Sequence, residues 1–268
     1  MVGVLLPDPE EVGASCSIMS MKWTIATVNW KSIEFIEYHA NFFHSFADDF
    51  EYLVCDNTVP YQRNELEEIG EKYKKIRLIY PDGENLSHGG GINNCLKEAR
   101  GKYILIMDPD FFWMKKSILK IFEHYFDQGY HAIGTEFWDH PFPMPWGAAY
   151  YTDEIRDLDC TARVEKHCGK CNNKLFDKWS DTGWEIRVRL QNQPHFGFRK
   201  VMSTCVPYMG DHFYSFRPIS FVYDGDFIAH HLMRGEYKDT DWHKDFVNNE
   251  MVIARKKYIE YFWKNLKD

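Results

Sequence analysis

GKYILIMDPD, residues 101–110, joins an unbroken apolar run to two aspartates that stand one residue apart. The apolar residues Tyr103–Met107 predict a short strand that is buried on both faces, as the strands of parallel sheets are. Asp108 and Asp110 follow at the carboxyl end of this strand, where ligands bind in open α/β sheets. Carboxylate oxygens suit Mg2+ or Mn2+, although Asp-Pro-Asp is also favourable turn chemistry. The stretch therefore predicts either a metal site or a turn, and the neighbouring motifs distinguish the two.

Strand and helix patterns alternate on both sides of this stretch. The β-rich segments at residues 22–29, 50–55 and 76–80 are each followed by a helical pattern, and a further helix is expected over 117–128. This alternation predicts a Rossmann-like α/β fold, with a mostly parallel sheet and helices on both of its faces. Polar residues again stand where the predicted strands end, namely Asn29, Asp56 and Asn57.

A stretch rich in glycine and asparagine, residues 85–94, precedes the apolar strand. Gly89, Gly90 and Gly91 are expected to form a loop, and the helix after it is expected over residues 93–100. Glycines let a backbone approach a ligand closely, and a helix N-terminus favours anionic groups. A flexible loop without a ligand is the plainer interpretation, and only the order of the surrounding motifs favours a phosphate-binding role.

In this order the motifs of residues 22–115 resemble the nucleotide-binding half of the family 2 glycosyltransferases, which have a GT-A fold. The matching positions are residues 27–30 (TVNW), the pair Asp56-Asn57, the stretch 88–94 and residues 101–110. The resemblance implies transfer of a hexosyl or deoxyhexosyl group from a UDP-, GDP- or dTDP-linked sugar to a saccharide or another hydroxyl acceptor. It also implies dependence on Mn2+ or Mg2+ and inversion at the anomeric carbon.

The resemblance assigns roles to individual residues. Asp56 would contact the base or ribose of the donor, Asp108 would sit near the ribose, and Asp110 would hold the metal. Members of the family often carry Asn or Arg where His88 stands, which leaves the identity of the base open. The full nucleotide-binding set would be Val28, Asn29, Asp56, Asn57, His88, Gly90, Asn93 and Asp108.

A histidine late in the chain is the third metal-ligand candidate. Many GT-A enzymes place such a histidine on the metal, and His230-His231 ends a β-rich stretch here. His231 is preferred over His230, so the expected metal ligands are Asp108, Asp110 and His231. A purely structural histidine is the alternative.

The catalytic base is expected in the second half, within residues 180–189 (SDTGWEIRVR). An inverting transfer needs a carboxylate that takes the proton of the acceptor hydroxyl. Asp181 or Glu185 can serve, and Asp181 is preferred because Thr182 and Glu185 have the spacing of a capping box.

A cluster of cysteine and histidine in the same half has two interpretations. Reduced, close-set Cys and His suit a structural tetrahedral Zn2+ site. The spacing is not that of a standard zinc finger, and a hairpin with incidental thiols is the preferred interpretation. The ligands of such a site would be Cys160, His167, Cys168 and Cys171.

The domain organisation is expected to be simple. Residues 1–20 read as an extension, and residues 21–268 as one domain with a nucleotide-binding half to residue 130 and an acceptor-binding, catalytic half after it. The second half is expected to hold a strand over 131–138, a loop over 139–152, a helix over 184–190, β-rich stretches over 199–206 and 220–230, and a long helix over 241–265.

The composition limits the partners and the location. The formal net charge is −8, and an acidic chain repels the phosphate backbone of nucleic acids. No run approaches ~18 apolar residues, so no spanning helix is expected, and nothing among the seven cysteines requires an oxidising compartment. We therefore expect a cytoplasmic protein, with peripheral membrane contact left open. The alternative functions are a nucleotidyltransferase and a non-catalytic nucleotide- or sugar-binding relative.

Overall fold

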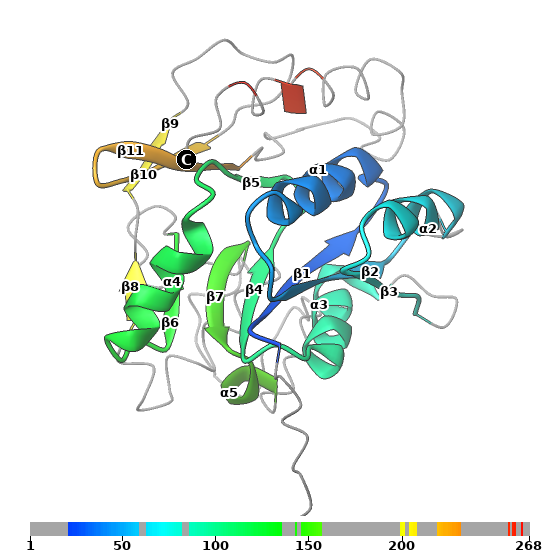
Figure 1. Cartoon of the computed structure of the whole chain (residues 1–268), viewed down its shortest axis with the longest axis horizontal. Coiled ribbons are helices and arrows are strands. Elements are labelled where there is room, and N and C mark those ends of the chain that lie inside the picture. The colour runs from blue at the N-terminus through cyan, green and yellow to red at the C-terminus, as the bar shows by residue number, and fades with distance from the viewer. Residues whose placement is uncertain are drawn as a thin grey trace, which may run out of the picture.

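The structure is a computed structural model with two β-sheets (Figure 1). Within the part of the chain that it describes, no helix has both the length and the apolar character needed to cross a membrane. Within the predicted C-terminal helix, the described positions 257, 259, 260 and 264 are helical. The described residues are 21–58, 63–81, 86–135, 143, 146–156, 199–201, 204–207, 219–231 and those four positions.

The larger sheet has seven strands in the order β3-β2-β1-β4-β7-β6-β8. Strand β1 lies between β2 and β4 and pairs with both in parallel, as expected for chain crossovers through helices. Strand β7 runs antiparallel between β4 and β6, and β8 is parallel to β6. The bounds are β1 Trp23–Asn29, β2 Phe50–Asp56, β3 Ile76–Ile79, β4 Tyr103–Met107, β6 Ala132–Gly134, β7 Gly147–Tyr151 and β8 Arg199–Val201.

Helices cover both faces of this sheet, which confirms the predicted α/β class. Successive residues of a strand point to opposite faces, so Ile25 joins one core cluster while Ala26 and Val28 join the other. The first, largely aromatic cluster includes side chains of α1, α2 and α4, and the second includes side chains of α3 and α5. The bounds are α1 Ile33–His44, α2 Arg63–Lys72, α3 Ser87–Glu98, α4 Ile118–Asp127 and α5 Thr152–Arg156.

The predicted glycine loop is wrong, because α3 already begins at Ser87 and contains all three glycines. Packing explains the difference. A Cβ at Gly91 would lie 2.7 Å from Val28 Cγ1, so glycine lets the first half of α3 approach the end of β1. This tertiary contact outweighs the low intrinsic helix propensity of glycine.

The predicted loop over residues 139–152 is also wrong in its last part, which forms strand β7. Met107 of β4 stands opposite Gly147 of β7. A Cβ at Gly147 would lie 2.6 Å from the ring of Phe111, so only glycine fits beside that ring. The expected strand over 131–138 is described only as the shorter β6.

The smaller sheet is antiparallel, in the order β5-β11-β10-β9, and lies beside the larger one (Figure 1). Strands β10 and β11 form a hairpin whose turn residues Asp224 and Gly225 have positive φ angles of 51° and 79°. Such angles suit the tight turns of two-residue hairpins. The stretch predicted over 199–206 is divided, because β8 belongs to the larger sheet and β9 to the smaller one. The bounds are β5 Phe111–Trp113, β9 Thr204–Pro207, β10 Ile219–Tyr223 and β11 Asp226–His231.

Candidate metal and nucleotide site

A buried hydrogen-bond network joins the carboxyl ends of β1 and β2. Asn29 Nδ2 donates to Asp56 Oδ1 at 2.9 Å, and the backbone N–H of Thr58 donates to the same oxygen at 3.1 Å. The hydroxyl of Ser32 donates to Asn29 Oδ1 at 2.9 Å, so it braces the turn into α1 rather than capping that helix. Asn29 and Asp56 have 0% exposure. The network holds the strand ends together, and a nucleotide contact through Asp56 stays a prediction.

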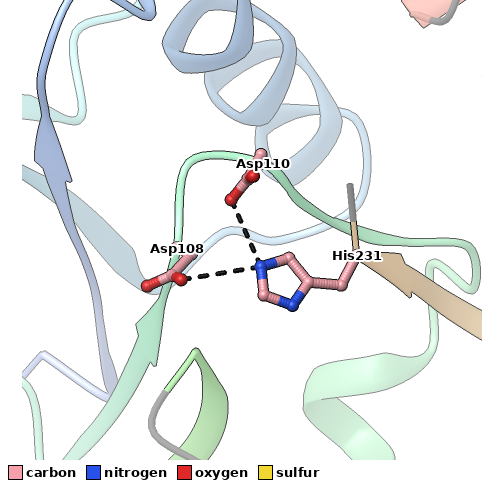
Figure 2. A group of neighbouring side chains, drawn as sticks. All are labelled: Asp108, Asp110 and His231. Atoms are coloured by element: carbon pink, nitrogen blue, oxygen red, sulfur yellow. Dashed lines mark ion pairs between the residues drawn. The ribbon is translucent and has the colours of Figure 1, made fainter. Parts of the chain in front are cut away.

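Three side chains converge at the carboxyl end of β4, as Figure 2 shows: Asp108, Asp110 and His231. One potential ligand atom from each lies within 4.8 Å of the others. His231 Nε2 is 3.3 Å from Asp110 Oδ1 and 3.6 Å from Asp108 Oδ2. The pairing of β5 with β11 sets this geometry, because Phe111, the residue after Asp110, stands opposite His231. The structure thus brings together the three expected metal ligands.

The charges of this cluster compensate one another. Burial lowers the pKa of His231, but the neighbouring Asp110 and Asp108 carboxylates raise it further, to about 9. The ring lies against Phe111 and Trp146, with centroids 5.6 and 5.5 Å away. Its Nδ1 is buried and has no hydrogen-bond partner among the described residues. The positive charge that the two carboxylates favour on His231 is one that a divalent cation could supply instead, and His231 would have to lose the proton on Nε2 to bind such a cation.

His230 is separated from this cluster although it adjoins His231 in the sequence. Neighbouring residues of a strand point to opposite faces, and His230 Nδ1 lies 2.8 Å from Ser220 Oγ in the adjacent strand β10. Burial lowers the pKa of His230 to about 4. The side-chain arrangement favours His231 as the candidate ligand, in line with the prediction.

His88 extends the cluster on its other side. It lies in the first turn of α3, and its Nε2 is 3.2 Å from Asp108 Oδ1. Asp108 thus faces His88 with one oxygen and His231 with the other. The early start of α3 produces this contact, because it fixes His88 on a helix rather than in a loop.

The remaining predicted nucleotide contacts have mainly structural positions. Val28 is buried in the core beneath Gly91, and Gly90 lies inside α3 against Leu86. Asn57 donates its backbone N–H to Asn29 O at 2.9 Å. Asn93 lies on α3 and is partly buried. Their contacts with a nucleotide stay predictions.

Several candidates fall outside the described residues. These are the possible bases Asp181 and Glu185 and the possible zinc ligands Cys160, His167, Cys168 and Cys171.

Sequence reasoning missed His39, a residue of α1. Its Nε2 lies 2.9 Å from the carbonyl oxygen of Pro109, the residue between the two aspartates. The side chain has 0% exposure. The available signal was a histidine on the apolar side of the helix IEFIEYHANFFH, where Phe35 and Phe42 are also buried.

Residues 36–144 match the family model described as glycosyl transferase family 2. This part of the chain is therefore similar to glycosyl transferase family 2. The family 2 segment, residues 36–144, contains Asp56, His88 and both aspartates of the cluster, whereas His231 lies outside it. The match confirms the predicted resemblance to this family.

Three solved structures illustrate the similarity of the chain to known folds. S. aureus TarS 1-349 in complex with UDP-GlcNAc is 18% identical, with a TM-score of 0.43 over 52% of this chain and 48% of that one. The mannosyltransferase PcManGT from Pyrobaculum calidifontis, in complex with GDP-Man and Mn2+, is 16% identical, with a TM-score of 0.46 over 52% and 46%. Glucosyl-3-phosphoglycerate synthase from Mycobacterium tuberculosis is 10% identical, with a TM-score of 0.41 over 51% and 59%.

The chain thus spans about half the length of these structures. A comparison with the curated proteins finds no significant match.

Proposed function

We propose that the protein is a metal-dependent, inverting glycosyltransferase that moves a hexosyl or deoxyhexosyl group from a nucleotide-diphosphate sugar to a hydroxyl acceptor. The acceptor is proposed to be a saccharide, and the location cytoplasmic. In this proposal residues 21–130 bind the nucleotide, and residues 131–268 supply the acceptor side and the base. The family 2 match over residues 36–144 supports the class of reaction.

The observation that carries the metal dependence is the convergence of Asp108, Asp110 and His231. Two carboxylates and one imidazole face one another within 4.8 Å. The imidazolium of His231 now supplies the positive charge between them, and its pKa of about 9 reflects how strongly this place attracts a cation. Asp110 is buried and Asp108 is half-buried, and burying a carboxylate without a cation is costly, so this donor set fits a divalent ion.

The chemistry of the donors indicates which ion. Carboxylate oxygens suit Mg2+ and Mn2+ alike, whereas a nitrogen ligand favours a transition metal over Mg2+. We therefore propose Mn2+ as the preferred ion, held by Asp110 and His231 with Asp108 beside them. When bound, such an ion supplies positive charge next to the diphosphate of the donor.

The residues of the chain perform the remaining steps of the proposed reaction. The oxygen of the acceptor hydroxyl attacks the anomeric carbon while the bond from that carbon to the phosphate oxygen breaks. The nucleoside diphosphate leaves with the bonding electrons, and the hydroxyl proton passes to a carboxylate, proposed as Asp181 with Glu185 as the alternative. His88, whose Nε2 is 3.2 Å from Asp108 Oδ1, is proposed to donate to an oxygen of the donor from the first turn of α3.

Titration calorimetry of the full chain with UDP, GDP and dTDP tests the proposal, each with Mn2+, with Mg2+ and with a chelator. One nucleoside diphosphate should bind more tightly with Mn2+ than with Mg2+, and only weakly with the chelator. The corresponding nucleotide sugars then serve as donors in a transfer assay with saccharide acceptors. Equal binding in all three conditions would refute the metal dependence, whereas metal-dependent binding without transfer to any acceptor would favour a non-catalytic relative.

A further inference from the structure

We infer that His39 is a positioning residue for the metal site: its ring holds the carbonyl of Pro109 and so fixes the turn that presents Asp108 and Asp110. The inference rests on the proposed function, since it concerns how the same site is held. Among the described residues, the hydrogen bond of His39 is to the backbone between the two aspartates and not to either aspartate side chain, so His39 would act through that backbone.

The hydrogen bond defines the state of the ring. A carbonyl oxygen only accepts, so His39 Nε2 must carry the proton and donate to Pro109 O across 2.9 Å. The ring stays neutral, because burial lowers the pKa of His39 to about 4 even though the Pro109 hydrogen bond and the charge of Asp110 raise it. His39 Nδ1 is buried and has no hydrogen-bond partner among the described residues.

Packing alone does not explain a histidine at this position. Aromatic rings surround His39, with centroids 5.2 Å away at Tyr38, 5.3 Å at Phe112 and 6.5 Å at Tyr52. A phenylalanine would fill such a pocket without burying two polar nitrogens, one of them unpaired, which is unfavourable. The imidazole differs from phenylalanine chiefly in its N–H, and that N–H is directed at Pro109.

The Pro109 carbonyl lies in the part of the turn that the main-chain hydrogen bonds on either side do not hold in place. The backbone on either side is fixed by main-chain hydrogen bonds, from Asp108 N to Trp146 O at 3.0 Å and from Phe111 N to Asp108 O at 3.1 Å. The peptide unit between Pro109 and Asp110 carries the carbonyl that His39 holds. Rotation of that unit would move the Asp110 carboxylate away from His231 Nε2, now 3.3 Å distant.

The same helix offers a matched control. His44 also lies on α1 and also bonds a backbone carbonyl through its ring, with Nδ1 2.9 Å from Ala40 O. It packs against Phe50 and Tyr73, at centroid distances of 5.2 and 5.1 Å. None of its described contacts involves the turn at Pro109, so its replacement alters the helix without altering that turn.

Mn2+ titration of the full chain, followed by the electron paramagnetic resonance signal of free Mn2+, tests the inference in His39→Phe, His39→Gln and His44→Phe. Residues that orient metal ligands typically change metal affinity by about 10- to 100-fold, and we expect a loss in this range for His39→Phe. The Gln amide can place an N–H where His Nε2 stands, so His39→Gln should recover most of the affinity. His44→Phe should bind Mn2+ as tightly as the wild type, even if it unfolds at a lower temperature.

The outcomes separate this inference from the proposed function. Wild-type protein that takes up no Mn2+ would refute the metal dependence and the role of His39 with it. If the wild type binds Mn2+ and a folded His39→Phe variant binds it equally tightly, only the role of His39 is overturned. If His39→Phe does not fold, His39→Asn replaces it: the shorter amide cannot reach Pro109, and Asn that binds as well as Gln would overturn the inference.

Discussion

The two sheets contribute to the candidate metal site in different ways. The larger sheet supplies Asp108 and Asp110 from a turn directly after β4, where they stand one residue apart. Hydrogen bonds within the turn, to Trp146 and to His39 fix its backbone. The smaller sheet supplies His231 from the end of β11, and its place depends on the pairing of β11 with β5. The comparison teaches that both carboxylates come from one turn, which β7 and α1 hold in place, whereas the imidazole depends on the pairing of β11 with β5.

The largest effect is expected from Asp110→Asn, which removes a carboxylate of the larger sheet. Changes to residues that merely orient ligands cost about 10- to 100-fold in metal affinity, so loss of a ligand should cost at least about 100-fold. Mn2+ titration measures the effect. The control is Asp226→Asn in the smaller sheet, where Asp226 pairs with Lys115 at 2.9 Å. If Asp226→Asn lost as much Mn2+ affinity as Asp110→Asn, the loss would not be specific to the carboxylate of the proposed site.

Replacement of each histidine of β11 by glutamine tests the contribution of the smaller sheet. His231→Gln should weaken Mn2+ binding by at least about 10-fold, because it removes the imidazole that faces both aspartates. His230→Gln should leave Mn2+ binding unchanged and lower the free energy of unfolding by about 1–3 kcal/mol, through loss of the buried contact with Ser220. Chemical denaturation provides the second measurement. The reverse result would identify His230 as the ligand.

The pH dependence of the metal-free protein distinguishes the same two histidines. The pKa of His231 is raised from 6.5 to about 9, so its contribution to stability is complete below pH 6.5 and is lost as the pH rises through 9. A loss on the order of 1–3 kcal/mol is expected. The pKa of His230 is lowered to about 4 in the folded protein. As the pH falls from 6.5 towards 4, the unfolded chain takes up a proton on His230 that the folded protein does not, so the free energy of unfolding decreases.

Denaturation across this pH range checks both signs. The alkaline loss of stability should disappear in His231→Gln and persist in His230→Gln. An alkaline loss of the same size in His231→Gln would show that another group causes it.

The smallest expected effect is on the free energy of unfolding, through two residues with left-handed backbone, one next to each sheet. Lys31 follows β1 with a φ of 53°, and Asp224 in the hairpin of the smaller sheet has a φ of 51°. Left-handed backbone is unfavourable for lysine and better tolerated by aspartate. Lys31→Gly should therefore raise the free energy of unfolding by about 0.5–1 kcal/mol, and Asp224→Ala should lower it by a similar amount. Thermal unfolding measures both, and destabilisation by Lys31→Gly would mean that the lysine side chain makes a larger contribution than its backbone costs.

The sequence was sufficient for the elements that repeat a regular pattern. The strand Tyr103–Met107 has the predicted bounds, because an unbroken apolar run has few alternatives to a buried strand. The expected ligands Asp108, Asp110 and His231 do come together. The prediction that they converge came from the resemblance to a family. Pattern and spacing alone do not reveal which late strand pairs with the residues after Asp110.

Other features depend on contacts that a local pattern does not contain. The glycines of α3 read as a loop, but their small size is what allows the helix to approach Val28. Strand β7, beginning at Gly147, read as loop because it is enclosed between β4 and β6 by pairing with distant residues. His39 read as part of an apolar helix face, and only its distance to Pro109 shows another role.

The sequence separation between the two sides of the cluster has a consequence for biosynthesis. A chain is made from its N-terminus, so Asp108 and Asp110 leave the ribosome well before His231. Until the β10–β11 hairpin has been synthesised and has paired with β5, the nascent protein carries two facing carboxylates without their imidazole. We therefore expect the proposed metal site to reach its full affinity only late in translation, and a ribosome-bound chain stalled before Asp226 should retain Mn2+ poorly.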